Sequence, residues 1–67
     1  MAINARYHLP QFVVNHIINA VQKLVYGKII KRLPVDHIVD LRQYDQEAVL
    51  RCQRDCYNYL KYGIAIQ

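Results

Sequence analysis

The chain contains no serine and no threonine, and its only glycines are Gly27 and Gly63. The side-chain hydroxyls are therefore those of six tyrosines, which excludes a serine or threonine nucleophile. Two isolated glycines cannot form the glycine-rich loop that holds phosphate groups in nucleotide-binding proteins. These absences predict a protein that is not an enzyme and that binds no cofactor.

Long runs of one kind are also absent. No apolar run reaches the ~18 residues that cross a bilayer, because Asn15, His16 and Asn19 interrupt the best candidate. The N-terminus lacks the uninterrupted apolar core and the small-residue cleavage site of a signal peptide. No run of five or more like charges occurs, so the chain has no basic tail. We therefore expect a soluble, cytoplasmic protein.

The sequence shows no pattern typical of a metal site. Cys52 and Cys56 are four residues apart in a helical pattern, so their side chains share one face, which is a poor geometry for a disulfide between them. Structural zinc sites usually combine two close pairs of ligands, whereas the three histidines here are isolated from one another. The pattern predicts two buried thiols and no metal.

Asp36 and Asp40 are one helical turn apart, with His37 between them. Such a carboxylate pair can serve acid–base chemistry or bind a magnesium ion. The dipole at the start of a helix, however, favours aspartates at these positions without any ligand. We therefore assign these residues no catalytic role.

What the chain has in excess is apolar surface. Hydrophobic residues make up 54% of only 67 residues, with a net charge of +4 and a pI near 9.3. A chain of this length forms at most one domain, residues 1–67, and buries only about 60% of the surface that its unfolded form exposes. We expect another chain to cover part of the apolar surface. The positive charge favours acidic partners.

The longest patterned stretch is residues 10–26. Its apolar side chains recur with the 3.6-residue period of an α-helix and form one wide stripe: Val13, Val14, Ile17, Ile18, Val21, Leu24 and Val25. Gly27 could end the helix, but the isoleucines that follow would prolong the stripe. Pro34 stops a helix in either case. We favour one continuous helix over residues 10–33.

Three further segments complete the predicted fold. Residues 1–9 alternate between apolar and polar and predict an extended arm. Residues 34–43 begin with proline and carry apolar residues on one side, which predicts a short second helix. Asp45 is a suitable N-cap for a third helix over residues 45–62, and residues 63–67 form a tail. The sequence thus predicts an all-α domain of three helices with a short extended N-terminal arm.

The surplus of apolar surface points to binding of another protein. The stripe of the first helix is wider than two short helices can cover, which predicts a homodimer built around that helix. Leu50 and Tyr57 lie beside the main apolar stripe of the third helix and suggest a second contact surface. We predict a non-catalytic regulator or adaptor, with an interface formed by Val14, Ile17, Ile18, Val21, Val25, Leu50 and Tyr57.

A small DNA-binding regulator is the alternative. Polar residues alternate on a short strand that leads into a helix, and this arrangement of Asn4, Arg6 and His8 resembles the ribbon-helix-helix repressors. Residues 34–43, with the turn and helix that follow, resemble a helix-turn-helix. Together with the basic cluster after the first helix, these resemblances imply nucleic-acid contacts from Arg6, His8, Lys28, Lys31 and Arg32.

Overall fold

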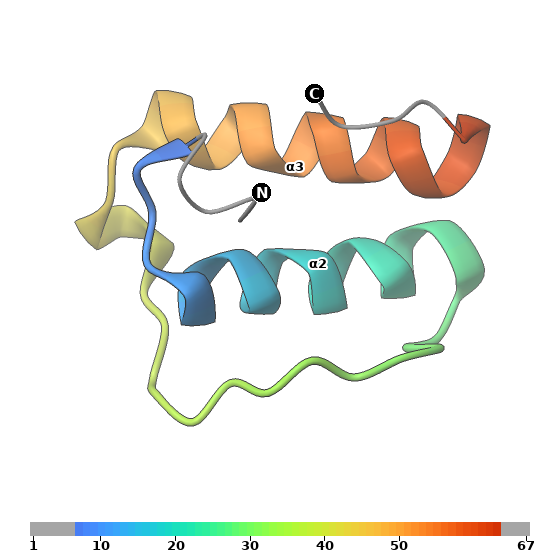
Figure 1. Cartoon of the computed structure of the whole chain (residues 1–67), viewed down its shortest axis with the longest axis horizontal. Coiled ribbons are helices and arrows are strands. Elements are labelled where there is room, and N and C mark those ends of the chain that lie inside the picture. The colour runs from blue at the N-terminus through green and yellow to red at the C-terminus, as the bar shows by residue number, and fades with distance from the viewer. Residues whose placement is uncertain (1–6, 64–67) are drawn as a thin grey trace.

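The structure, a computed structural model, describes residues 7–63 (Figure 1). Within that range the chain forms two α-helices, α2 (Gln11–Tyr26) and α3 (Gln46–Tyr62), and one short 3-10 helix, η1 (Leu41–Gln43), with no strand. The protein is all-α, but the predicted three-helix architecture is wrong. No helix in this part of the chain has the length and apolar content required to cross a membrane.

The two helices lie side by side and run in the same direction (Figure 1). The hydroxyl of Tyr26 donates to the carbonyl of Leu60 over 3.2 Å, which joins their C-terminal ends. Parallel neighbours require a connection that returns along the whole of α2, whose 16 residues span about 24 Å. Residues 28–40, here called the strap, make this return as extended chain on the face of α2 opposite α3.

Gly27 ends α2. Its φ of 77° is left-handed, and its backbone N–H donates to the carbonyl of Lys23 over 2.9 Å. Glycine adopts this conformation without the steric cost that a Cβ adds, and the hydrogen bond satisfies one of the last carbonyls of the helix. The predicted continuous helix over residues 10–33 is therefore wrong, because the chain turns at Gly27 into the strap.

Three amide side chains of α2 face the strap. Asn15, Asn19 and Gln22 recur every three or four residues along one face of the helix, and each has at most 9% of its surface exposed. A buried side-chain amide is costly unless it is hydrogen-bonded, and all three donate to backbone carbonyls of the strap. This set, here called the amide ladder, gives α2 a second buried face.

The amide ladder pairs with the strap as a neighbouring strand would. Asn19 donates from Nδ2 to the carbonyl of Leu33 over 3.0 Å and accepts from the amide of Leu33 over 2.9 Å. Gln22 accepts from the amides of Ile30 and Lys31 and donates to the carbonyl of Lys31, at 2.7–3.0 Å. Asn15 donates to the carbonyl of Pro34 over 2.9 Å. All these bonds use strap backbone, so they do not depend on which side chains the strap carries.

The predicted second helix over residues 34–43 is also wrong. Residues 34–40 are not helical, and only Leu41–Gln43 form η1. The apolar residues of this segment do not form one buried face, since Ile38 is 99% exposed. The amide ladder holds the chain extended up to Pro34, whose carbonyl accepts from Asn15, so this segment begins from a non-helical backbone. Without this helix, the likeness to a helix-turn-helix fails as well.

The core lies between α2 and α3. Its buried side chains are Tyr7, Leu9, Val13, Val14, Ile17, Val21, Val49, Cys52 and Cys56. The apolar stripe of α2 is thus covered largely by α3 of the same chain, whose buried stripe has the helical spacing that the sequence predicts. The surface on which the predicted helix-centred homodimer depends is therefore occupied within one chain.

The ends of α3 agree with its sequence. The carboxylate of Asp45 accepts from the backbone N–H of Glu47 over 3.0 Å, and Gly63 ends the helix with a φ of 74°. On the exposed side, Arg51 and Glu47 form an ion pair of 3.1 Å one turn apart. Asp45 and Gly63 thus bracket the predicted third helix.

Candidate protein-binding groove

A second stripe runs along α3 beside its buried one. Leu50, Arg54, Tyr57 and Lys61 follow one another at spacings of four, three and four residues, which places them on one side of the helix. Three of them line a groove of about 410 Å³ between α2 and α3, together with residues of α2; its lining is Ala20, Val21, Leu24, Leu50, Gln53, Arg54 and Tyr57.

Leucines stand on both walls of this groove. Leu24 of α2 is 72% exposed and Leu50 of α3 is 63% exposed. Between them lies Val21, which belongs to the core, so the floor of the groove continues the apolar interior. An apolar side chain placed here would contact both helices at once. A partner bound in this groove would remove both of these exposed leucine side chains from water.

The rim of the groove is basic. Lys61 donates to the hydroxyl of Tyr57 over 2.9 Å, and its ammonium lies 5.2 Å and 5.5 Å from the ring centroids of Tyr57 and Tyr62. The hydrogen bond to Tyr57 raises the pKa of Lys61, because it favours the charged form. Arg54 is largely exposed and lies 4.0 Å from Asp55. These contacts hold the side chains of Lys61 and Arg54 near the apolar floor of the groove.

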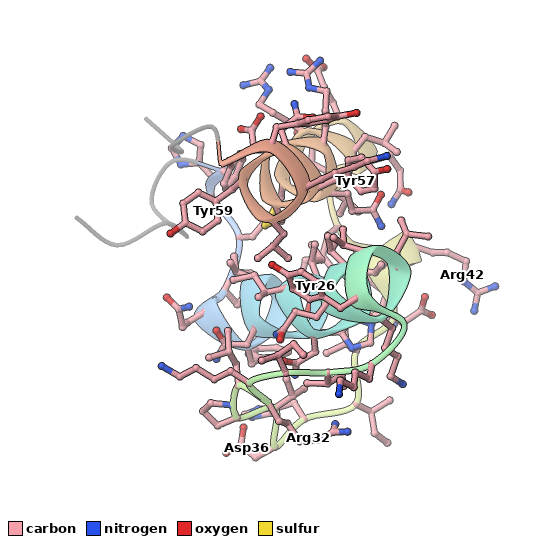
Figure 2. The ribbon with its side chains drawn as sticks, turned by 90° about the vertical axis from the view of Figure 1, so that its right-hand side faces the viewer. Tyr26, Arg32, Asp36, Arg42, Tyr57 and Tyr59 are labelled. Carbon is pink, nitrogen blue, oxygen red and sulfur yellow. The ribbon has the colours of Figure 1, made fainter. Side chains whose placement is uncertain are left out.

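A smaller depression lies elsewhere on the surface. Its volume is about 280 Å³, and it is lined by Ile18, Gln22, Tyr26, Ile30, Lys31, Leu33 and Leu60. Here Tyr26 bridges to the backbone of Leu60, so the two helices are already connected across it. Figure 2 shows Tyr57 and Tyr59 on opposite sides of α3. Of these two tyrosines, Tyr57 lines the larger groove. We take the larger groove as the candidate site.

The predicted interface residues fall into three groups. Val14, Ile17 and Val21 are buried in the core. Ile18 and Val25 are half-buried against it. Leu50 and Tyr57, from α3, lie in the groove with accessible surface, and Val21 forms part of its floor. The α2 part of the predicted interface is therefore mostly packed within the chain, while the α3 part is accessible.

Of the five predicted nucleic-acid contacts, three lie on one segment and two lie elsewhere in the chain. Arg6 lies outside the described residues. His8 lines a depression with Asp45 and Glu47 at the start of α3. The strap carries the other three: Lys28, Lys31 and Arg32. Figure 2 shows Arg32 on the side of α2 that faces away from α3. The ribbon-helix-helix likeness depends on residues that are mostly outside the described range.

The acidic residues of the strap face different partners. Asp36 pairs with Nδ1 of His37 over 2.7 Å, and that histidine stacks on Phe12 with a centroid distance of 4.4 Å. Asp40 instead accepts from Nε of Arg42 over 3.0 Å, and this bond lowers the pKa of Asp40. Over residues 7–63 no group of three or more histidine, cysteine or acidic side chains could hold a metal ion.

The two cysteines form a buried pair of free thiols in the core. The thiol of Cys56 donates to Cys52, and both this bond and burial raise the pKa of Cys56 above its ordinary value of 9.0. The unfolded chain therefore loses this proton at a lower pH than the folded chain. Below about pH 9 the folded and unfolded chains both keep the Cys56 proton. Above that pH only the folded chain keeps it, so the free energy of unfolding falls as pH rises.

We expect this fall to be about 1.4 kcal/mol per pH unit for the one proton concerned. The measurement is urea unfolding at about pH 8 and about pH 10 for the native chain and for the double variant Cys52→Ala with Cys56→Ala, which lacks both thiols, because the same bond lowers the pKa of Cys52. Tyrosines and lysines titrate in both proteins, so the difference between them reports the thiol pair. Equal losses in the two proteins would contradict a raised pKa of Cys56.

The predicted interface includes three residues that line the groove, Val21, Leu50 and Tyr57, and misses the others. The sequence places Leu24 on the apolar stripe of α2, but the helical period of that stripe does not show that α3 leaves Leu24 exposed. Arg54 and Lys61 read as ordinary exposed cations. The spacing of Leu50, Arg54, Tyr57 and Lys61 along one side of α3 is the signal that could have found them.

Comparison of the chain with family models, with curated proteins and with solved structures found no match. The geometry of the groove and the charges around it are therefore the basis of the functional proposal.

Proposed function

We propose that the protein is a small non-catalytic regulator or adaptor that binds a partner protein in the groove between α2 and α3. The observation that carries the proposal is the open apolar floor between Leu24 and Leu50, which are 72% and 63% exposed. The partner supplies an apolar segment. A second copy of the chain could supply it only through this groove, because the stripe of α2 is buried.

The expected energetics are those of a modest interface. Full burial of a leucine side chain contributes about 1.5–3 kcal/mol, so two leucines and a tyrosine supply a useful part of a micromolar affinity. Tyr57 is already held by its hydrogen bond to Lys61, so little side-chain freedom remains to be lost on binding. A cytoplasmic location is part of this proposal, supported by two free thiols in the core.

The test is a photo-crosslink from inside the groove. A benzophenone amino acid replaces Gln53, which lines the groove, and in a matched control replaces Ile38, which is 99% exposed on the strap. In extracts of the source cell, we expect one defined protein adduct from position 53 and not from position 38. Adding Leu50→Glu to the position-53 protein should remove it.

Identification of the adduct by mass spectrometry, followed by binding of the purified partner, completes the test. Adducts that form equally from both positions, or that survive Leu50→Glu, would contradict the proposal, as would the absence of any adduct. A crosslinked dimer of the chain that Leu50→Glu abolishes would support binding through the groove and identify the partner as a second copy.

Nucleic-acid binding is the second candidate, and the strap supplies the observation that favours it. The side chains of Lys28, Lys31 and Arg32 are exposed and make no hydrogen bond or ion pair with the rest of the chain that the structure describes. The amide ladder holds the backbone of Lys31 by two bonds, which fixes the position from which its side chain extends. Three unpaired cations on a braced segment suit phosphate groups.

Salt dependence tests this candidate. Binding through three phosphate contacts should weaken with a slope of about −2 to −3 in log affinity against log salt, because counterions are released from the nucleic acid. The double substitution Lys31→Ala with Arg32→Ala should reduce that slope by about two. An affinity that is absent at low salt, or a slope that the substitution leaves unchanged, would remove the candidate.

A further inference from the structure

The charges around the groove restrict what kind of segment it takes. Three cations lie along the groove side of α3 or next to it: Arg54 lines the groove, Arg51 lines the depression that adjoins it, and Lys61 is bonded to the groove residue Tyr57. Two carboxylates offset part of this charge, since Glu47 is paired with Arg51 and Asp55 lies 4.0 Å from Arg54, whereas Lys61 has no acidic partner among the described residues. The edge formed by α3 therefore carries an excess of positive charge.

The apolar floor excludes a purely electrostatic partner. Phosphate groups of a nucleic acid would find cations at the rim but no polar group at Val21, Leu24 or Leu50. A protein segment with apolar residues on one side and carboxylates on the other would satisfy both parts of the surface. Charge complementarity of this kind guides the encounter and selects among partners more than it adds affinity.

The shape of the groove favours a helix. Its α3 wall is a straight stripe at helical spacing from Leu50 to Tyr57, about 10 Å long, and Lys61 lies one turn beyond it. The second wall is the C-terminal half of α2, which runs parallel to the first (Figure 1). A third helix laid along both would contact them through residues spaced three and four apart, as amphipathic helices do in grooves of other proteins.

A second copy of the chain suits this surface less well. In a two-fold symmetric dimer the same patch meets itself, so one interface would hold the basic rims of both copies. The chain as a whole carries a net charge of +4, which adds to the repulsion. An acidic partner removes both costs.

From the apolar floor and the basic α3 edge, we propose that the groove binds an acidic amphipathic helix, with its leucine-like residues between Leu24 and Leu50 and its carboxylates on Arg54 and Lys61. The inference rests on the function proposed above and specifies the chemistry of the partner. Bound in this way, the helix completes a three-helix bundle in which two helices come from this chain.

The test uses designed helical peptides and the full chain. One peptide carries leucines at i, i+3, i+4 and i+7 with flanking glutamates, a second replaces every glutamate by lysine, and a third has the acidic composition in scrambled order. We expect the acidic helix to bind about tenfold or more tightly than the lysine version at low salt, and the difference to shrink as salt screens the rim. NMR shifts should move at Leu24, Leu50 and Tyr57.

Charge exchange gives the decisive control. Arg54→Glu, a change at an exposed side chain, should weaken binding of the acidic helix and strengthen binding of the lysine helix. The inference is overturned if the lysine helix or the scrambled peptide binds the native chain as tightly as the acidic helix, if no peptide binds at millimolar concentration, or if the shifts map to the strap. An adduct from Gln53 that proves to be a second copy would overturn it too, while leaving binding through the groove intact.

Discussion

Replacing Asn19 by alanine is expected to lower the free energy of unfolding by about 2–3 kcal/mol, although the residue is polar and lies on what the sequence presents as the polar face of α2. Its amide both donates to and accepts from the backbone of Leu33. Removing it leaves one N–H and one C=O of the strap without a partner, and a partly buried group in that state costs about 1–3 kcal/mol.

The comparison that isolates the amide ladder is with Asn58. This side chain is a half-buried amide of α3 for which the structure shows no hydrogen bond with residues 7–63. Asn58→Ala should change the free energy of unfolding by no more than about 0.5 kcal/mol in urea titrations. Asn19→Asp should be worse than Asn19→Ala, because it buries a charged carboxylate that faces the carbonyl oxygen of Leu33 and has no proton to donate to it.

Equal effects at Asn19 and Asn58 would show that the strap is not held in this way. Amide hydrogen exchange gives an independent readout, because the backbone N–H of Leu33 and of Lys31 should be protected in the native chain. Asn19→Ala should remove protection at Leu33 and preserve it at Lys31, which Gln22 holds.

Ile17→Ala is expected to have the second large effect, a loss of about 3 kcal/mol. Ile17 is 1% exposed and lies between α2 and α3, so truncation both removes apolar contact and leaves a cavity. A domain of this size has little stability to spare, since small domains rarely exceed the lower part of the 5–15 kcal/mol range. At 37 °C a large part of the variant should be unfolded.

Leu24→Ala is the matched control for Ile17→Ala. Both residues lie on the same apolar stripe of α2 by sequence, but Leu24 faces the open groove and should cost less than about 0.5 kcal/mol. Circular dichroism during thermal unfolding distinguishes the two. If the two substitutions destabilise the chain equally, a second chain must cover Leu24, and the groove is not open in the isolated protein.

Particular residues explain how far the sequence predicted the fold. Asp45 predicted the start of α3, because an N-cap carboxylate acts through its neighbours in the sequence, and the left-handed Gly63 ends the helix where the tail was predicted to begin. The buried stripes of α2 and α3 also followed from their period. Gly27 was the correct end of α2, but the isoleucines beyond it extended the apolar pattern, and a pattern does not show where a backbone turns.

The strap could not be predicted from the same signals. Asn15, Asn19 and Gln22 have the period of a polar face, and periodicity does not distinguish a face turned toward water from one turned toward backbone. Residues 34–43 carry apolar residues at spacings that suit a helix, yet six hydrogen bonds to the amide ladder hold residues 30–34 extended just before them.

The sequence predicted the α3 side of the groove but not the exposure of Leu24 on its α2 side. Leu50 and Tyr57 stood out because they lie beside the main stripe of their own helix. Leu24 did not, because its exposure depends on the packing angle of a second helix, which no local pattern encodes. The homodimer was inferred from the width of the α2 stripe, and the return of the chain through the strap is what lets α3 cover most of it.

The affinity of the crosslinked partner for two glutamate variants tests the central claim most directly. Leu50→Glu places a charge on the wall of the groove, and Ile38→Glu places the same charge on the strap at a side chain that is 99% exposed. By isothermal calorimetry, we expect Leu50→Glu to raise Kd more than tenfold and Ile38→Glu to leave it within about twofold. A Kd that Leu50→Glu leaves unchanged, or that Ile38→Glu raises as much, would contradict binding in the groove.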